Sequence, residues 1–211
     1  MASFAEVLER YAGRLTPRQW RLFACACVRR VEAATRGNSG AAIELAERFA
    51  DGKATEHQLA SARYGGRFLA GNAAWAVCWD PKEDARTMAE RAAAWTAGIL
   101  GELPPIYEGG GFRYGNFTAR DRSNDSLLFA DITLPLIDPA HFDPLWLAWN
   151  DGTVCHLAAA IYDDRDWEQM PILADALEDA GCGDERILGH CRGGGPHVRG
   201  CWVVDRVLGM Q

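Results

Sequence analysis

The chain has 211 residues, of which 48% are hydrophobic and 24% charged, and a formal net charge of -7. This balance is that of an ordinary globular protein and excludes an intrinsically disordered chain. The negative charge disfavours binding to phosphate backbones, and no apolar run approaches the ~20 residues that span a bilayer, so we predict neither a nucleic-acid nor a membrane partner.

The first two-fifths of the chain carry three sequences that are typical of helix starts. Thr16-Pro17-Arg18-Gln19 and Thr55-Glu56-His57-Gln58 match the capping box, and Asp80-Pro81-Lys82-Glu83 matches an N-cap followed by proline. Behind the first start, apolar residues recur at helical spacing: Trp20, Phe23, Ala24, Cys27, Val28 and Val31. We predict helices from Pro17 to before Gly37, from about Ile43 to Gly52, from Thr55 to about Trp79, and from Asp80 to about Gly101.

Four arginines of the first helix, Arg18, Arg21, Arg29 and Arg30, lie largely off its apolar stripe. We expect them to pair with the abundant carboxylates, each surface pair contributing only ~0–1 kcal/mol. A basic strip for an acidic ligand or a nucleic acid is the alternative, and the net charge disfavours it.

The pattern changes between Leu103 and Asn150, where prolines, glycines and aspartates are dense and no period persists. The stretch from Gly109 to Gly115 is predicted to form either a loop or a short hairpin. Because a long structureless connection is uncommon in a compact domain, we also expect short helices around Ser126–Asp131 and Pro144–Trp149.

The last quarter has a helical pattern again. We expect a helix from Gly152 to Asp163, a second after Asp166 that stops at Gly181, a short segment from Asp184 to Cys191, and a final helix from about His197 to Leu208. The predicted fold class is therefore all-α, a compact multi-helix domain with an irregular middle segment. We divide it into an N-terminal helical bundle (1–102), a connecting segment (103–150) and a C-terminal helical segment (151–211) packed with the first as one domain.

The cysteines and the first residues bear on localisation. Most of the seven cysteines lie inside apolar helical patterns and not at turn spacings, which is typical of reduced, buried thiols. The segment from Met1 to Glu6 has an early acid and no basic region before an apolar stretch, so it does not match a signal peptide. We therefore expect a cytoplasmic protein.

The most unusual stretch runs from His190 to Cys201 and contains three consecutive glycines followed by proline. A glycine run directly before a helix lets backbone N–H groups point at an anion, and the helix N-terminus adds partial positive charge. No Gly-Lys-Ser/Thr follows, so the stretch is not a P-loop. The candidate residues for binding a small anionic ligand are Arg192, Gly194, His197 and Arg199.

The same stretch offers a zinc site as a second interpretation. His197 and Cys201 are four residues apart and would share a helix face, and His190 with Cys191 or Cys182 would complete four ligands. Against zinc, the sequence contains no Cys-x-x-Cys pair.

The third interpretation of this stretch is a tight turn between two helices. The glycines would supply left-handed conformations, and the arginines would pair with acids such as Asp205 or Asp184. We favour this interpretation and therefore predict no cofactor, with zinc as the alternative.

No catalytic set stands out in the sequence. There is no Gly-x-Ser-x-Gly elbow, and the acidic cluster from Asp163 to Glu168 lacks the spacing and glycine of an EF-hand. Three tryptophans lie at helix junctions, Trp146, Trp149 and Trp167. We expect them to cover the helix ends, and lining a recognition groove is the alternative. We therefore predict a non-catalytic helical module that binds a protein partner, and as the alternative an anion-binding or metal-dependent activity in the Arg192–Cys201 loop.

Several segments together resemble one protein family. They are Arg21–Arg30, Glu47–Gly52, Trp149–Val154, Ala160–Arg165, Met170–Cys182, Ile187–Arg192 and Gly195–Asp205. These segments are similar to an uncharacterised family present in many copies in planctomycete bacteria. The resemblance covers nearly the whole chain except about Tyr107 to Asp125, and it implies a bacterial protein without implying an activity. Gly193-Gly194-Gly195-Pro196 departs from the Gly-Pro-Gly-Pro that the family usually shows.

Overall fold

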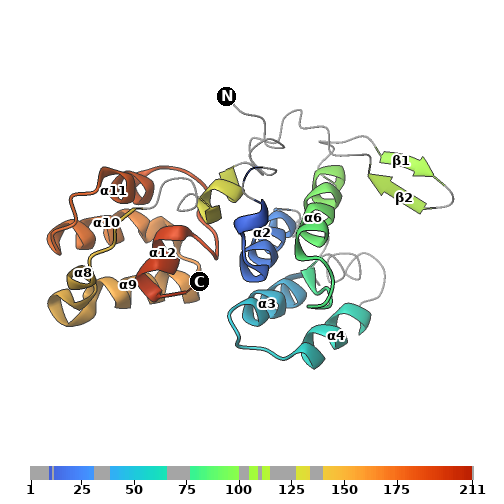
Figure 1. Ribbon diagram of the computed structural model, residues 1–211, viewed down its shortest axis with the longest axis horizontal. Coiled ribbons are helices and arrows are strands. Elements are labelled where there is room, and N and C mark those ends of the chain that lie inside the picture. Colours follow the sequence, from blue (N-terminus) through green and yellow to red (C-terminus); the bar gives the residue numbers. More distant parts are fainter. Residues whose placement is uncertain are drawn as a thin grey trace. The chain divides into compact units, whose positions relative to one another are not determined.

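The computed structural model of the protein describes residues 10, 12–30, 39–65, 77–99, 105–108, 111–114, 127–133 and 140–210. The chain divides into two compact units, Met1–Ser126 and Leu127–Gln211. Both are helical, and the first adds a two-stranded hairpin (Figure 1), so the predicted all-α class is confirmed. The division falls inside the predicted connecting segment 103–150, and the packing of both parts as one domain stays a prediction.

The N-terminal unit contains the elements η1 (Ala12–Arg14), α2 (Pro17–Arg29), α3 (Ser39–Ala50), α4 (Glu56–Gly65), α6 (Ala85–Ile99), β1 (Pro105–Glu108) and β2 (Gly111–Tyr114). Helix α2 packs against both α3 and α6, and α3 also packs against α4 (Figure 1). The predicted capping box starts α2: the Thr16 hydroxyl accepts the Gln19 N–H, and the Gln19 side chain accepts the Thr16 N–H. The apolar stripe behind this cap forms the core of the unit.

The structure corrects the predicted start of one helix in the N-terminal unit and decides between the loop and the hairpin predicted near Gly109. Helix α6 begins at Ala85 and not directly after Asp80, because Asp80 to Glu83 form a turn and the Asp84 carboxylate caps the helix by accepting the Thr87 N–H at 2.8 Å. Of the loop and the hairpin predicted near Gly109, the hairpin is present, with β1 and β2 antiparallel. The predicted extension of α4 to Trp79 lies partly outside the described residues.

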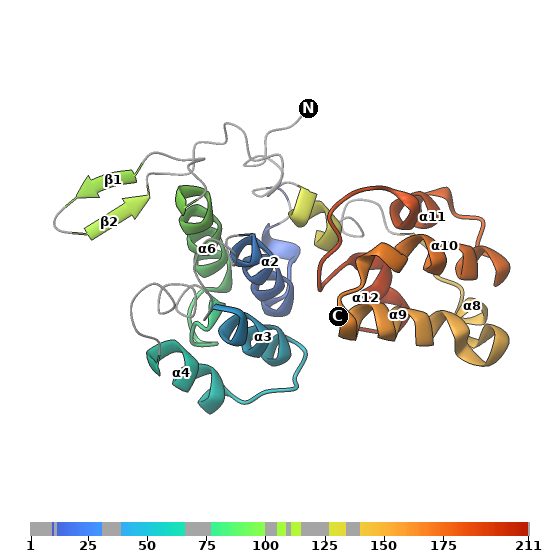
Figure 2. The same cartoon turned by 180° about the vertical axis from the view of Figure 1, so that it is seen from behind.

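The C-terminal unit contains a helix over 127–133, then α8 (Pro144–Ala148), η2 (Trp149–Gly152), α9 (Thr153–Asp164), η3 (Trp167–Gln169), α10 (Met170–Asp179), α11 (Glu185–Arg192) and α12 (Trp202–Leu208). The two short helices expected in the middle segment are therefore present. Helix α9 packs against α10 and α12, and α10 packs against α11 (Figure 2). Their apolar faces share one core, whose largest members include Ile161, Tyr162, Leu173, Leu177 and Trp202.

The chain between α11 and α12 differs from the prediction. The last helix starts at Trp202 and not at His197, because Gly200 has a φ of +95° that no α-helix accommodates and the Cys201 N–H closes a turn on the Val198 carbonyl at 2.8 Å. The left-handed conformation expected of the glycine run occurs at Gly200 and not at Gly193 to Gly195. The glycine run therefore does not lead directly into a helix.

The structure bears on two expectations, the reduced state of the cysteines and the lack of a membrane-spanning helix. All seven cysteines lie in the described part of the chain and are free thiols, six of them buried. Among the helices of the described ranges, none combines the length and the apolar character that crossing a bilayer requires.

Candidate metal centre

Four side chains of the C-terminal unit point their donor atoms at one place. They are Asp131 from the helix 127–133, His190 from α11, His197 from the connecting loop, and Cys201 at the N-cap of α12. One donor atom from each residue lies within 4.8 Å of the other three. Carboxylate oxygen, imidazole nitrogen and thiolate sulfur are all ligands that zinc accepts in proteins.

The local fold explains why these residues meet. His190 lies in the last turn of α11, and its ring stands 5.2 Å from the ring of the buried Trp202, centroid to centroid. The turn at Gly200 reverses the chain after His197 and places Cys201 beside both histidines. Asp131 is held from the loop side, because its Oδ2 accepts the Val198 N–H at 2.9 Å.

The other carboxylate oxygen of Asp131 faces the remaining three donors. Its Oδ1 lies 3.1 Å from Nε2 of His190 and 3.0 Å from Nδ1 of His197. The Cys201 Sγ lies 3.3 Å from Nε2 of His190 and 3.8 Å from Nδ1 of His197. Three different chemical donors thus surround the same small volume.

These distances can be compared with the edges of a zinc tetrahedron. With ligands at their usual distances of about 2.0 to 2.3 Å from the ion, neighbouring ligand atoms stand roughly 3.3 to 3.6 Å apart. The four distances above, 3.0, 3.1, 3.3 and 3.8 Å, fall within a few tenths of an ångström of that range. A tetrahedron has six such edges, and the two remaining pairs of donor atoms lie within 4.8 Å of each other.

The cluster is buried, and burial governs its electrostatics. The exposed fraction of the side chain is 3% for Asp131, 6% for His197 and 15% for His190. Burial opposes ionisation of Asp131, but hydrogen bonds from His190 and His197 outweigh it and hold the pKa of the carboxyl below its usual value. Burial, reinforced by the charge of Asp131, raises the pKa of the Cys201 thiol well above its usual value.

A small cavity adjoins the cluster on one side. It encloses about 200 Å³, and three of the four candidate ligands, Asp131, His190 and His197, form part of its wall. The Nε2 atom of His197 is buried and has no hydrogen-bond partner among the described residues. The cavity gives an ion a path to donor atoms that the core would otherwise enclose.

The structure brings together three of the five residues named as zinc candidates from the sequence. His190, His197 and Cys201 converge, although through a turn and not on one helix face. Cys191 and Cys182 lie in the apolar core but are not among the four converging donors, and burial raises the pKa of the Cys191 thiol to about 12.

Asp131 is the member of the cluster that sequence reasoning did not find. It lies 66 residues before His197, in a segment whose sequence predicted only a short helix. Its one usable signal in the sequence is a charged residue between apolar residues, Phe129 and Ile132, within a predicted helix.

The residues proposed for an anion site do not converge. Arg192 is turned outward and pairs with Asp175 at 2.8 Å and with Glu178 at 2.5 Å. Gly194 is exposed, and Arg199 is buried with its guanidinium 4.9 Å from the centre of the Tyr162 ring. Arg192 therefore pairs with nearby acids, as the turn interpretation expected of the arginines, and the acids are Asp175 and Glu178.

Comparison of the chain with protein-family models, with curated proteins and with solved structures gave no match.

Proposed function

We propose that the C-terminal unit binds a divalent transition-metal ion, with Zn²⁺ as the best fit to its donor set. The observation that carries the proposal is the convergence of Asp131, His190, His197 and Cys201, with four donor–donor distances close to the edges of a zinc tetrahedron. Sulfur and imidazole donors favour zinc over magnesium or calcium, which prefer oxygen ligands. This proposal replaces the favoured sequence interpretation, in which the same segment only joins two helices.

The competing explanation is a polar network without metal. In it, both histidines would donate to Oδ1 of Asp131 as neutral rings or cations. Such a network does not explain why a buried thiol contacts both imidazoles, because a thiol is only a weak hydrogen-bond donor and acceptor. A metal ion, by contrast, would bind the sulfur as thiolate and draw all four donors to one point.

The ligand count indicates what the ion would do. Four protein ligands complete a tetrahedron, which is the arrangement of structural zinc sites, whereas catalytic sites leave a position open. The ion would join α11, the loop and α12 to the helix 127–133. We infer a metal-stabilised helical module without catalysis, and we keep the protein partner and the planctomycete family as parts of the proposal. The sequence supports the family part of the proposal, because three of the four candidate ligands lie in the segments that resemble this family.

The direct test is metal analysis of the full-length protein together with its native mass. We expect close to one zinc ion per chain in protein purified without chelator, and a mass difference that chelation removes. Adding zinc to the chelated protein should raise its thermal unfolding temperature, since an ion that binds only the folded state stabilises it by about 4 kcal/mol at a thousandfold excess over Kd. Substoichiometric metal together with no thermal response to zinc would contradict the proposal.

Matched variants separate a site from nonspecific binding. Cys201→Ser and His197→Gln should each weaken zinc binding by at least an order of magnitude. Cys155→Ser alters a half-buried cysteine of α9 outside the cluster, and His156→Gln alters an exposed histidine of the same helix, so both should bind zinc like the parent protein. Equal losses in the cluster variants and their controls would assign the binding to the fold in general and not to these four residues.

A further inference from the structure

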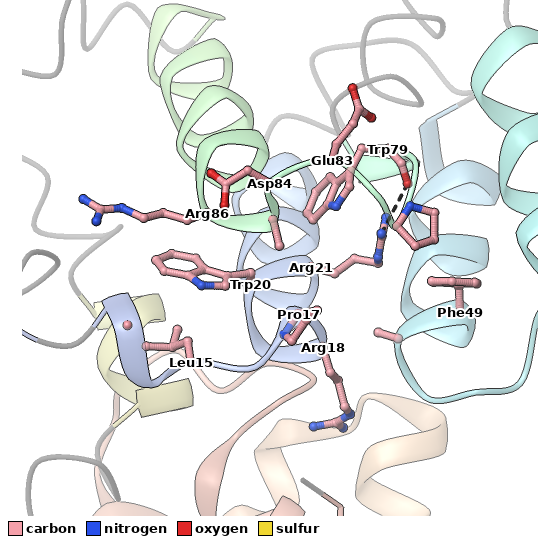
Figure 3. Close-up of a pocket in the computed structure, with 14 residues that line it drawn as sticks. Leu15, Pro17, Arg18, Trp20, Arg21, Phe49, Trp79, Glu83, Asp84 and Arg86 are labelled. Atoms are coloured by element: carbon pink, nitrogen blue, oxygen red, sulfur yellow. Dashed lines mark hydrogen bonds between the residues drawn. The ribbon is translucent and has the colours of Figure 1, made fainter.

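The N-terminal unit contains a larger cavity, unrelated to the metal centre. It encloses about 640 Å³, within the range of small-molecule sites, and its wall is formed by the start of α2, the end of α3 and the start of α6. Figure 3 shows Trp20, Arg21, Phe49 and Trp79 on this wall.

A buried guanidinium defines the chemistry of this cavity. Arg21 is only 3% exposed, although its sequence position off the apolar stripe predicted a surface charge. Its Nη1 and Nη2 donate to the carbonyl oxygens of Val77 at 2.7 Å and Trp79 at 3.2 Å. The guanidinium carbon lies 4.1 Å from the centre of the Trp79 ring and 5.0 Å from that of Phe49. Aromatic faces and backbone dipoles thus hold the group rigidly in place.

None of these partners of Arg21 is an anion. Across the described residues, no carboxylate forms an ion pair with Arg21, and only two of its five N–H groups have the partners named above. Burial lowers the pKa of Arg21, although Cys25, Cys78 and Glu83 oppose the shift. A buried cation without an anion is costly, so the site favours an anionic ligand.

The acids on the same wall are already engaged. Glu83 binds Arg63 through two hydrogen bonds of 2.6 and 3.2 Å and also accepts the Asp80 N–H. The Asp84 carboxylate caps α6. Glu83 still acts on Arg21 through space and raises its pKa, but the partner that it binds is Arg63.

The other arginines of the wall are engaged as well. Arg18 pairs with Asp51 at 3.0 Å and Arg86 with Glu90 at 2.7 Å. Figure 3 shows both side chains pointing away from Arg21. Arg21 is thus the cation that faces the cavity with donors to spare, and Trp20, Phe49 and Leu15 supply apolar surface beside it.

From this arrangement we propose that the cavity of the N-terminal unit binds a small organic anion, with a carboxylate, phosphate or sulfonate group on Arg21 and an apolar body along Trp20 and Leu15. The cavity volume admits a ligand of metabolite size, and the guanidinium offers the planar fork that matches such groups. The proposal is independent of the metal ion, because no residue of this wall belongs to the metal centre.

The probes for the test are benzoate, phenyl phosphate and benzenesulfonate, each titrated into the full chain by calorimetry, with benzamide as the uncharged counterpart of benzoate. We expect saturable one-site binding of at least one anion, and at least tenfold weaker binding of benzamide. Arg21→Gln should weaken the same anion tenfold or more, because a charge-assisted hydrogen bond is lost. Saturable binding of none of the three anions, or equal binding of benzoate and benzamide, would overturn the proposal.

Two further variants keep the test valid if Arg21→Gln unfolds. Ala85→Trp adds a large side chain on the wall without changing Arg21, and it should abolish binding while the helical circular dichroism stays unchanged. Arg91→Gln removes a charge from an exposed position of α6 outside this wall, and it should bind the anion like the parent protein. Undiminished binding by Ala85→Trp, or equal losses in Arg21→Gln and Arg91→Gln, would place the anion elsewhere.

Discussion

The two units of the protein differ in the charged groups that they bury. In the N-terminal unit one cation, Arg21, is surrounded by carbonyl oxygens and aromatic rings and borders a cavity of about 640 Å³. In the C-terminal unit Asp131, two imidazoles and a thiol surround a volume of atomic size. The first arrangement leaves room for a molecule that carries negative charge, and the second leaves room for a cation. The buried charges and the size of the space beside them therefore distinguish the two binding sites that we propose.

The largest expected effect concerns the C-terminal cluster. Asp131→Ala removes the acceptor of the Val198 N–H and of both histidines, and leaving buried polar groups unpaired should cost about 3 kcal/mol or more. Urea denaturation combined with hydrogen exchange of α11 and α12 measures this loss. The control Asp175→Ala, whose exposed carboxylate pairs with Arg192, should cost less than about 1 kcal/mol. Comparable costs for the two variants would mean that the cluster is not a central element of this unit.

The corresponding change in the N-terminal unit should be smaller. Arg21→Gln leaves the Val77 and Trp79 carbonyls poorly paired, but it also removes a buried charge without an ion pair, so we expect a net destabilisation of about 2 kcal/mol. Hydrogen exchange of α2 and α6 in the full chain reports it. Arg86→Gln, which breaks an i,i+4 pair with Glu90, should cost only about 0.5 kcal/mol. A stabilising Arg21→Gln would show that desolvation of the cation outweighs all its contacts.

A third prediction concerns the turn that brings the metal ligands together. Gly200 has a φ of +95°, so Gly200→Ala should destabilise the C-terminal unit by about 1 to 2 kcal/mol and weaken zinc binding by displacing Cys201. Gly194→Ala is the matched control, because no atom lies within 4 Å of the added carbon and its φ is not positive. Thermal unfolding with and without zinc distinguishes the two. Equal effects of both substitutions would show that the turn at Gly200 does not position Cys201.

The smallest expected effect concerns the helix that carries Arg21. Thr16→Ala removes the capping hydroxyl at the start of α2 and should cost about 1 kcal/mol. Thr16→Ser keeps the hydroxyl and should restore most of the loss, as measured by urea denaturation. If Ser does not rescue the variant, the effect comes from packing and not from the cap.

By itself the sequence determined the local structure of most of the protein. The Thr16 and Thr55 capping boxes, the stop at Gly52 and the helices of the last quarter depend on contacts between residues a few positions apart. The predicted start of α12 is wrong because the composition of the Gly–Pro segment does not reveal that Gly200 is the glycine with the left-handed backbone conformation. The Arg192–Cys201 stretch was recognised as unusual, but its three interpretations could not be separated, since they use the same residues.

Only the tertiary structure determined which residues that are distant in the sequence are in contact. Asp131 joins His197 across 66 residues of chain, and Arg21 becomes buried because the backbone at Val77 and Trp79 folds over it. Neither contact has a sequence period, because each depends on the packing of helices that are distant in the chain. A charged residue in a helix gives no local sign of whether it will face water or a ligand, since that choice is made when the helices pack.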